Sequence, residues 1–303
     1  MSEVGDGQRT TLATSPDAFG VWSPADADVL PWPQFLRAAA AAGYSSVELG
    51  PYGYLPTTGS ELADALAQHN LRMAGGYVVG SFHTPDPGDE LLQELVDVAA
   101  LTKAVGAENL VIIARAPSKT QRRDPLDTEG WRLMTANLLR INRQVAEAYG
   151  LRLVYHPHRD MAVETRGETE RLIEDTRGEV AICMDVGQYQ STDGDPVAFI
   201  REHRDLVRHI HIRDLQPAVL TKARAGETSF HQLVKDGLFC DPGEGEVDLD
   251  GVSAALQEVA YDGPIVVERS PLGASLDQAQ VIAARSAQRL VAAGIGRIVP
   301  RDD

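Results

Sequence analysis

Four segments of this chain place a side chain that can bind a metal ion at or near the end of an apolar run. His156 follows LRLVY, Asp185 follows VAICM, His211 lies near the end of VRHIHI, and Glu268 follows PIVV. Two imidazoles and two carboxylates suit Mn²⁺, Co²⁺, Fe²⁺ or Mg²⁺, and the mixture of nitrogen and oxygen favours Mn²⁺ or a neighbouring transition metal over Ca²⁺. We therefore predict one divalent metal ion at these four residues, where it would polarise a substrate carbonyl or hydroxyl.

Each of these residues also has a structural interpretation. An unpaired carboxylate is costly to bury at the end of an apolar strand, which favours a functional role for Asp185 and Glu268. His209 and His211 share one face of a strand, which is either the interior of a barrel or its helix-facing layer. We expect His211, nearer the strand end, to bind the metal, and His209 to be a packed or supporting residue.

Further polar residues close to these segments are candidates for proton transfer and substrate binding. His158 shares a strand face with His156, and each could be a ligand, a base or a supporting residue. We predict that His158 or Glu268 takes a proton from the substrate, and that His158 or His83 protonates a departing hydroxyl. Substrate contacts are expected from Glu48, Gln188 and Arg213.

The positions of the candidate ligands predict a parallel barrel. Short apolar segments alternate with helical patterns, which is typical of parallel strands joined by helices. The expected strands are residues 18–22, 45–50, 71–80, 108–116, 151–157, 180–185, 207–212 and 264–268. Eight such units predict a single α/β (β/α)8 TIM barrel, in which the carboxyl ends of the strands converge on one mouth. A doubly wound open sheet is the alternative, but no GxGxxG motif follows the first expected strand.

One domain is expected, with residues 1–17 as a flexible polar lead-in and residues 18–303 as the barrel. No composition shift or low-complexity linker marks a second domain. Residues 216–250 are expected to be largely irregular, with a short helix in SFHQLVKDGLF. This segment could cap the barrel mouth or reach a neighbouring protomer.

Composition restricts the partners and the compartment. A net charge of −16 disfavours nucleic acid. No apolar run is long enough for a transmembrane helix, and the lead-in lacks the apolar centre of a signal peptide. Cys183 and Cys240 lack the spacing of metal ligands, which fits a reducing compartment. We expect a cytoplasmic homo-oligomer that binds a small polyol or sugar.

At these residues the chain resembles the xylose-isomerase-like, sugar phosphate isomerase/epimerase barrels. The motifs YHPHRDMAVET, MDVGQ, HIHIRD, SFHQLVKDGLFCDPGEGEVD and PIVVERS carry the resemblance. YSSVELGPYGYLP and GYVVG extend it towards the N-terminus. The pattern is closest to the inosose (2-keto-myo-inositol) dehydratase branch. The resemblance implies a TIM barrel with a metal at the four strand-end positions. It also implies a reaction that removes a proton beside a carbonyl and then returns it or expels a hydroxyl.

One position departs from the family pattern. The usual Asp-x-Gly-His motif is replaced by Asp185-Val186-Gly187-Gln188, and Gln is neither an acid nor a base near neutral pH. Our first hypothesis is a lyase that dehydrates a keto-inositol or keto-sugar through an enediolate. The alternatives are a sugar isomerase or epimerase, a C-glycoside deglycosidase-type eliminase on 3-keto-glycosides, and a carbohydrate-binding barrel without turnover. Endonuclease IV belongs to the same family, but the charge and the lack of its additional ligands disfavour that activity.

Overall fold

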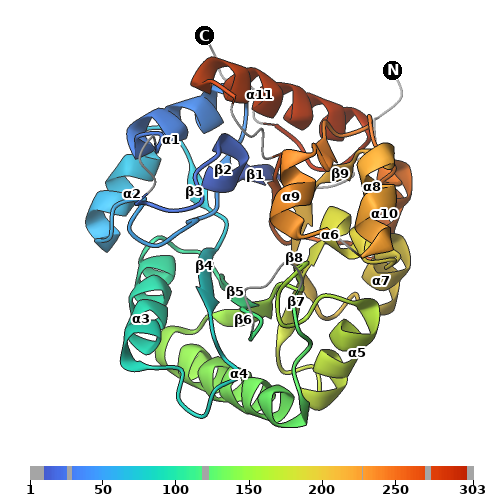
Figure 1. The fold of residues 1–303 in the computed structure, drawn as a ribbon. Coiled ribbons are helices and arrows are strands. Elements are labelled where there is room, and N and C mark those ends of the chain that lie inside the picture. Colours follow the sequence, from blue (N-terminus) through green and yellow to red (C-terminus); the bar gives the residue numbers. More distant parts are fainter. Residues whose placement is uncertain (1–9, 26–28, 118–122, 227, 270–273, 299–303) are drawn as a thin grey trace.

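The computed structural model describes residues 10–25, 29–117, 123–226, 228–269 and 274–298. Parallel strands form a ring that is surrounded by helices (Figure 1). The order around the ring is β3-β2-β1-β11-β8-β7-β6-β5-β4. Its strands are β1 (Leu12–Thr14), β2 (Ser46–Val47), β3 (Arg72–Met73), β4 (Gly76–Gly80), β5 (Asn109–Ala114), β6 (Arg152–Tyr155), β7 (Ala181–Asp185), β8 (Val207–Ile212) and β11 (Ile265–Val267). The two ends of this order belong to one expected strand, residues 71–80, so the ring is the expected TIM barrel.

Most of the helices cover the outside of the ring and join successive strands, while α8 (Pro217–Ala225) and α9 (Phe230–Lys235) lie at one end of it. The others are α1 (Trp32–Ala41), α2 (Gly59–Ala67), α3 (Asp89–Ala104), α4 (Thr128–Tyr149), α5 (Arg166–Asp175), α6 (Val186–Ser191), α7 (Pro196–Glu202), α10 (Leu249–Glu258) and α11 (Leu276–Ala292). Among the described residues, no helix is both long and apolar enough to cross a lipid bilayer.

The first strand is not where the sequence placed it. Leu12–Thr14 forms β1 and pairs with both β11 and β2. The expected strand at residues 18–22 overlaps instead with a 3₁₀ helix, Pro16–Phe19. The barrel therefore begins inside the segment that we expected to be a lead-in, while residues 1–9 lie outside the described part. Three-residue strands such as β1 are too short for periodicity to identify.

Alternation along the strands decides which side chains enter the barrel. On β8, Ile210 and Ile212 pack with the helices in the main apolar core, so His209 and His211 point inward. The same rule applies to β7, where Ile182 and Met184 face the helices. The period of two therefore turns the strand-end ligand candidates to the inside of the ring. His209 and His211 accordingly lie on the barrel interior and not in the helix-facing layer.

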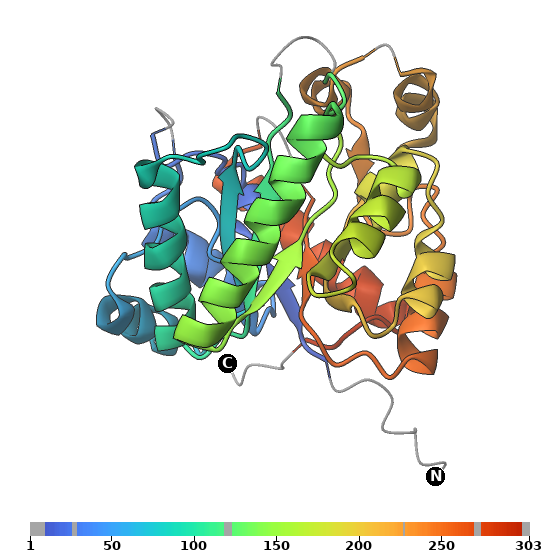
Figure 2. The ribbon, with the colours of Figure 1, turned by 90° about the horizontal axis from the view of Figure 1, so that it is seen from below.

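Residues 216–250 fold over the carboxyl ends of the strands. Helices α8 and α9 stand at one end of the barrel, beyond the strands (Figure 2). A short antiparallel pair, β9 (Asp214–Leu215) with β10 (Phe239–Cys240), connects this segment to the end of β8. The segment contains more regular structure than expected. It caps the barrel mouth, which was the first of the two positions that we considered for it.

Candidate active site

The carboxyl ends of the strands open into a cavity of about 630 Å³. Six of the predicted site residues line it: Glu48, His156, His158, His211, Arg213 and Glu268. Asp185 and Gln188 lie just behind this lining and contact it. His83, three residues past β4, is not among the lining residues. The structure therefore gathers eight of the nine candidates and leaves His83 outside the cluster.

Arg213 sits between the two carboxylates of the predicted metal centre. Its Nε lies 2.9 Å from Asp185 Oδ2, and its Nη2 is in close contact with Glu268 and 3.2 Å from Asp17 Oδ2. Burial alone would raise the pKa of Glu268, but the charges of Arg213 and His211 hold it well below its usual range. Asp185 behaves in the same way, with burial outweighed chiefly by Arg213. Both carboxylates are therefore ionised inside the protein.

Two residues near the N-terminus contribute to this cluster although sequence analysis missed them. Asp17 pairs with Arg213, and Ser15 Oγ donates a hydrogen bond to Glu268 Oε1 at 2.8 Å. Both follow β1, in the segment assigned to the lead-in. If the first strand had been placed at residues 12–14, Ser15 and Asp17 would have followed a strand end and would have been candidates by the same rule as the other site residues.

His156 fits a metal ligand because its ring is buried without hydrogen bonds. Neither ring nitrogen has a hydrogen-bond partner among the described residues, and Nε2 lies 3.7 Å from Asp185 Oδ2. Burial lowers the pKa of His156, so the imidazole is neutral and its lone pair is available. Ligand atoms of Asp185, His211 and Glu268 also lie within 4.8 Å of one another. Two ionised carboxylates beside the neutral imidazole of His156 and the ring of His211 form a donor set that suits a divalent cation.

Cys183 is a further potential ligand that the sequence did not indicate. It lies inside the barrel, and its sulfur is within 4.8 Å of ligand atoms of His156 and His211. Burial raises the pKa of its thiol to about 11. Because only the thiolate binds metal well, the ionised carboxylates are the better ligands, and Cys183 is a small buried side chain of the barrel interior.

Glu48 links the two histidines of β8. Its Oε1 lies 3.1 Å from Nε2 of His209 and 3.1 Å from Nε2 of His211. Burial would raise the pKa of Glu48, but the two histidines lower it to about 2. His211 Nδ1 points the other way, lies 3.2 Å from Glu268 Oε2 and has no hydrogen-bond partner among the described residues. Glu48 therefore orients His211 so that Nδ1 faces the other candidate ligands. Burial would lower the pKa of His211, but Cys183, Glu268 and Glu48 raise it well above its usual value, so a metal ion would bind Nδ1 by displacing a proton.

His158 and Gln188 form a pair at the side of the cavity. His158 Nδ1 lies 2.7 Å from the carbonyl oxygen of Arg159, which can only accept, so Nδ1 carries the proton. Nε2 then accepts from the Gln188 amide at 2.9 Å. Burial and the charges of His156 and Arg213 lower the pKa of His158 to about 3. His158 is thus a neutral imidazole whose lone pair is held by Gln188.

One part of the cavity lining is apolar and comes largely from the cap, whereas Glu94 and Arg115 add charged groups elsewhere in the lining. The ring of Phe230, on α9, packs edge-on against His158 with centroids 4.7 Å apart. Phe239 lies 4.8 Å below the Arg213 guanidinium. Trp22 and Val234 also line this part. A ligand thus meets charged groups at the strand ends and apolar surfaces nearer the mouth.

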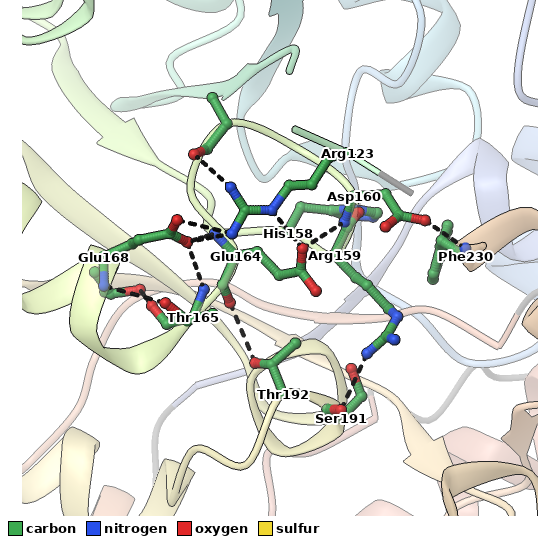
Figure 3. Close-up of polar contacts among 12 residues, drawn as sticks. Arg123, His158, Arg159, Asp160, Glu164, Thr165, Glu168, Ser191, Thr192 and Phe230 are labelled. Carbon is green, nitrogen blue, oxygen red and sulfur yellow. Dashed lines mark hydrogen bonds and ion pairs between the residues drawn. The ribbon is translucent and has the colours of Figure 1, made fainter. Parts of the chain in front are cut away.

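The segment that follows β6 is anchored on both sides by buried polar contacts (Figure 3). Arg123 holds Glu164 at 2.5 Å and Glu168 at 2.7 Å. Arg159 Nη2 donates to the carbonyl of Ala223, at the end of α8, at 2.7 Å. Asp160 accepts from the backbone N–H of Phe230 at 2.5 Å. These contacts fix the backbone that carries His156 and His158, and they tie it to the cap.

The PGEGEV run has a structural explanation. The buried carboxylate of Asp214 accepts hydrogen bonds from the backbone N–H groups of Leu215 (2.8 Å), Gly243 (2.8 Å), Gly245 (3.0 Å) and Val247 (3.0 Å). A Cβ at Gly245 would lie 2.2 Å from Asp214 Oδ1, so no other residue fits there. This part of the SFHQLVKDGLFCDPGEGEVD motif therefore holds the cap on the end of β8.

Comparisons with known proteins identify the family of this chain. Residues 36–287 match the family model described as Xylose isomerase-like TIM barrel. The chain is 30% identical over 245 residues to the Rhizopine catabolism protein MocC of Rhizobium meliloti, covering 78% of this chain and 74% of that protein. It is also 30% identical over 245 residues to an Inosose dehydratase of Salmonella agona, covering 78% and 80%. The solved structure of the IOLI protein with a binding zinc atom superposes with a TM-score of 0.70 at 17% identity, covering 93% and 98%.

Proposed function

The chain belongs to the xylose isomerase-like TIM barrel family, and on that basis we propose that it is a divalent-metal-dependent dehydratase acting on a keto-inositol or keto-sugar. The observation that carries this proposal is the gathering of His156, Asp185, His211 and Glu268 at the inner end of one cavity. The curated relatives named inosose dehydratase support the reaction class.

We propose that these four residues hold one metal ion, with Mn²⁺ as the preferred ion. When bound, the metal would polarise a carbonyl and so lower the pKa of the adjacent C–H. Nitrogen ligands together with carboxylates are compatible with Mn²⁺ and with Zn²⁺, the metal in the IOLI protein. Ser15 and Glu48 keep their hydrogen-bonded partners Glu268 and His211 in orientation.

His158 is the proposed proton carrier. It lines the cavity and is neutral, whereas both oxygens of Glu268 are already in contact with other side chains. Once the Gln188 amide no longer donates to His158 Nε2, this nitrogen takes the proton from the carbon next to the carbonyl. Its low pKa makes the protonated ring a strong acid, and the same proton then goes to the departing hydroxyl, which leaves as water. His83 plays no part in this proposal because it does not line the cavity.

Substrate hydroxyls are held by the polar groups around the reacting carbons. Arg213 lines the cavity, and its carboxylate partners hold the guanidinium in place. It can therefore bind substrate oxygen atoms without a change of position. Gln188, once released from His158, offers an amide donor. The Phe230 and Trp22 side of the cavity excludes water from the reacting carbons.

A second candidate is a sugar epimerase or isomerase using the same residues. Gln188 favours it, because an amide cannot supply the additional proton that a family histidine could, and a returned proton would then end the reaction. Incubation of keto-inositols and keto-sugars with Mn²⁺-loaded protein in D₂O separates the two. Mass spectrometry that detects a product lacking one water supports the dehydratase. Deuterium uptake without water loss supports the epimerase. If no candidate substrate loses water or takes up deuterium, the result supports a carbohydrate-binding protein without turnover.

A further inference from the structure

A continuous set of buried polar contacts runs through the barrel from the amino ends of the strands to the proposed metal centre. It passes from Arg152 to Asn109, His209, Glu48 and finally His211. Every member after Arg152 is at most 2% exposed. Buried polar groups are costly unless partnered, so this arrangement calls for an explanation beyond packing.

The orientation of the Asn109 amide is fixed by its other partners. Its Nδ2 donates to the backbone carbonyl of Arg208 at 2.9 Å, and its Oδ1 accepts from Arg152 Nη1 at 3.0 Å. A carbonyl cannot donate and a guanidinium cannot accept, so the amide cannot be flipped. Nδ2 is therefore the group that faces His209 Nδ1, at 3.4 Å.

This orientation determines which nitrogen of His209 carries the proton. Because Asn109 offers an N–H to Nδ1, that nitrogen is an acceptor, and the proton of the neutral ring sits on Nε2. Nε2–H then lies 3.1 Å from Glu48 Oε1, as a close polar contact whose angle falls outside that of a hydrogen bond. A Cβ at Gly75 would lie 3.3 Å from Cε1 of His209, so the glycine at this position leaves space for the ring.

Glu48 contacts both His209 and His211, so its position also determines the orientation of the His211 ring. The same Oε1 that contacts His209 contacts His211 Nε2, so the carboxylate keeps a proton on Nε2 and turns Nδ1 towards Glu268 and Asp185. We propose that Asn109 and His209 are positioning residues, which fix Glu48 and thereby the ring of His211 from the opposite end of the barrel. The part of this proposal that concerns metal affinity rests on the metal centre proposed above.

The first test is the ¹⁵N spectrum of histidine-labelled, metal-free protein. We expect His209 to show a protonated Nε2 and an accepting Nδ1, and we expect Asn109→Leu to convert it to a mixture of tautomers. A His209 that carries its proton on Nδ1 in the wild type, or a spectrum unchanged in the variant, would overturn the proposal. This readout does not depend on any metal.

The second test is Zn²⁺ affinity by titration calorimetry. Loss of an outer partner of a metal ligand typically weakens binding about 10–100-fold, so we expect about tenfold weaker binding for His209→Leu. His209→Gln keeps an N–H donor near Glu48 and should stay within about threefold of the wild type. A purely structural role predicts that the two variants bind equally, and that result would refute the positioning role.

Matched controls separate stability from positioning. His203→Gln removes a histidine that contacts Glu170 at 3.1 Å away from the cavity, and Thr102→Val removes a buried hydroxyl bonded to the Val98 carbonyl at 2.6 Å. Both should bind Zn²⁺ as the wild type does, even where they unfold more easily. A wild-type protein without Zn²⁺ affinity overturns the metal centre, and the ¹⁵N spectrum then decides the role of Asn109 by itself.

Discussion

Gln188 donates a hydrogen bond to the Nε2 lone pair of His158 at 2.9 Å, and this contact holds the cavity imidazole in its neutral form. The residue that departs from the family motif is therefore the direct partner of the proposed proton carrier. This relationship connects the unusual position in the sequence with the protonation state of the site.

Replacing Gln188 by Ala should raise the pKa of His158, because a donor to the lone pair stabilises the neutral ring. The acid limb of the kcat/KM profile should move to higher pH, since His158 must be neutral to take the proton. An NMR titration of His158 measures the pKa directly. Gln190→Ala, on the same helix with its amide on the Glu246 carbonyl, is the control. An unchanged profile together with an unchanged pKa would contradict the role of the pair.

Protein stability should fall as the pH drops below neutral. The pKa of His158 lies near 6.5 in an unfolded chain and at about 3 when folded, so between these values only the unfolded chain binds the proton. Glu48 adds a second loss between 4.5 and about 2, for the same reason. Each group contributes up to about 1.4 kcal/mol per pH unit in its window. Urea unfolding at several pH values measures this slope.

The His158→Asn variant tests the source of that acid sensitivity. Its stability should fall less steeply than that of the wild type between pH 6.5 and 4.5, where Glu48 does not yet contribute. His231→Gln, at an exposed position on α9, should keep the wild-type slope. Equal slopes in wild type and His158→Asn would mean that other groups cause the acid loss.

Removal of Arg213 should destabilise the metal-free protein strongly. Arg213→Leu leaves the carboxylates of Asp185 and Glu268 buried without their cation, which typically costs about 3–5 kcal/mol. Added Mn²⁺ should recover part of this loss, because it supplies positive charge to the same carboxylates. Arg208→Leu, half-buried on the same strand, is the control. Chemical denaturation with and without metal measures both effects, and a variant as stable as Arg208→Leu would contradict them.

Asp214→Asn should loosen the cap without removing the metal site. The change places an NH₂ group among four backbone donors, and loss of such bonds costs about 1–3 kcal/mol. Hydrogen exchange should accelerate at residues 241–247, while Zn²⁺ affinity stays close to wild type. Asp205→Asn, with an 87% exposed side chain, is the control. Unchanged exchange at these amides would show that Asp214 does not anchor the run.

Chelation should abolish turnover, and Mn²⁺ should restore it. His211→Ala removes a proposed ligand, so the purified variant should contain much less than one metal per chain and should stay inactive when Mn²⁺ is added. Elemental analysis of both proteins, alongside the product assay, measures the two effects together. Full activity in His211→Ala would overturn the site assignment.

The sequence by itself was sufficient for the barrel and for the four strand-end ligand candidates. Apolar runs that end on His156, Asp185 and Glu268 are local patterns, and the parallel fold brings such ends together whatever the details of packing. The burial of Asp185 was also foreseeable, because its strand is apolar throughout.

Only the tertiary structure decided which partner each of these residues has. Periodicity cannot detect a three-residue strand, so the sequence did not predict Ser15 and Asp17 as residues of the site. The face taken by His209 and His211 depended on which neighbours pack against the helices. The exclusion of His83, the Gln188 contact to His158 and the connection from Asn109 to His211 join residues that are distant in the chain. A pattern along one strand carries no information about such contacts, because they depend on the closure of the ring.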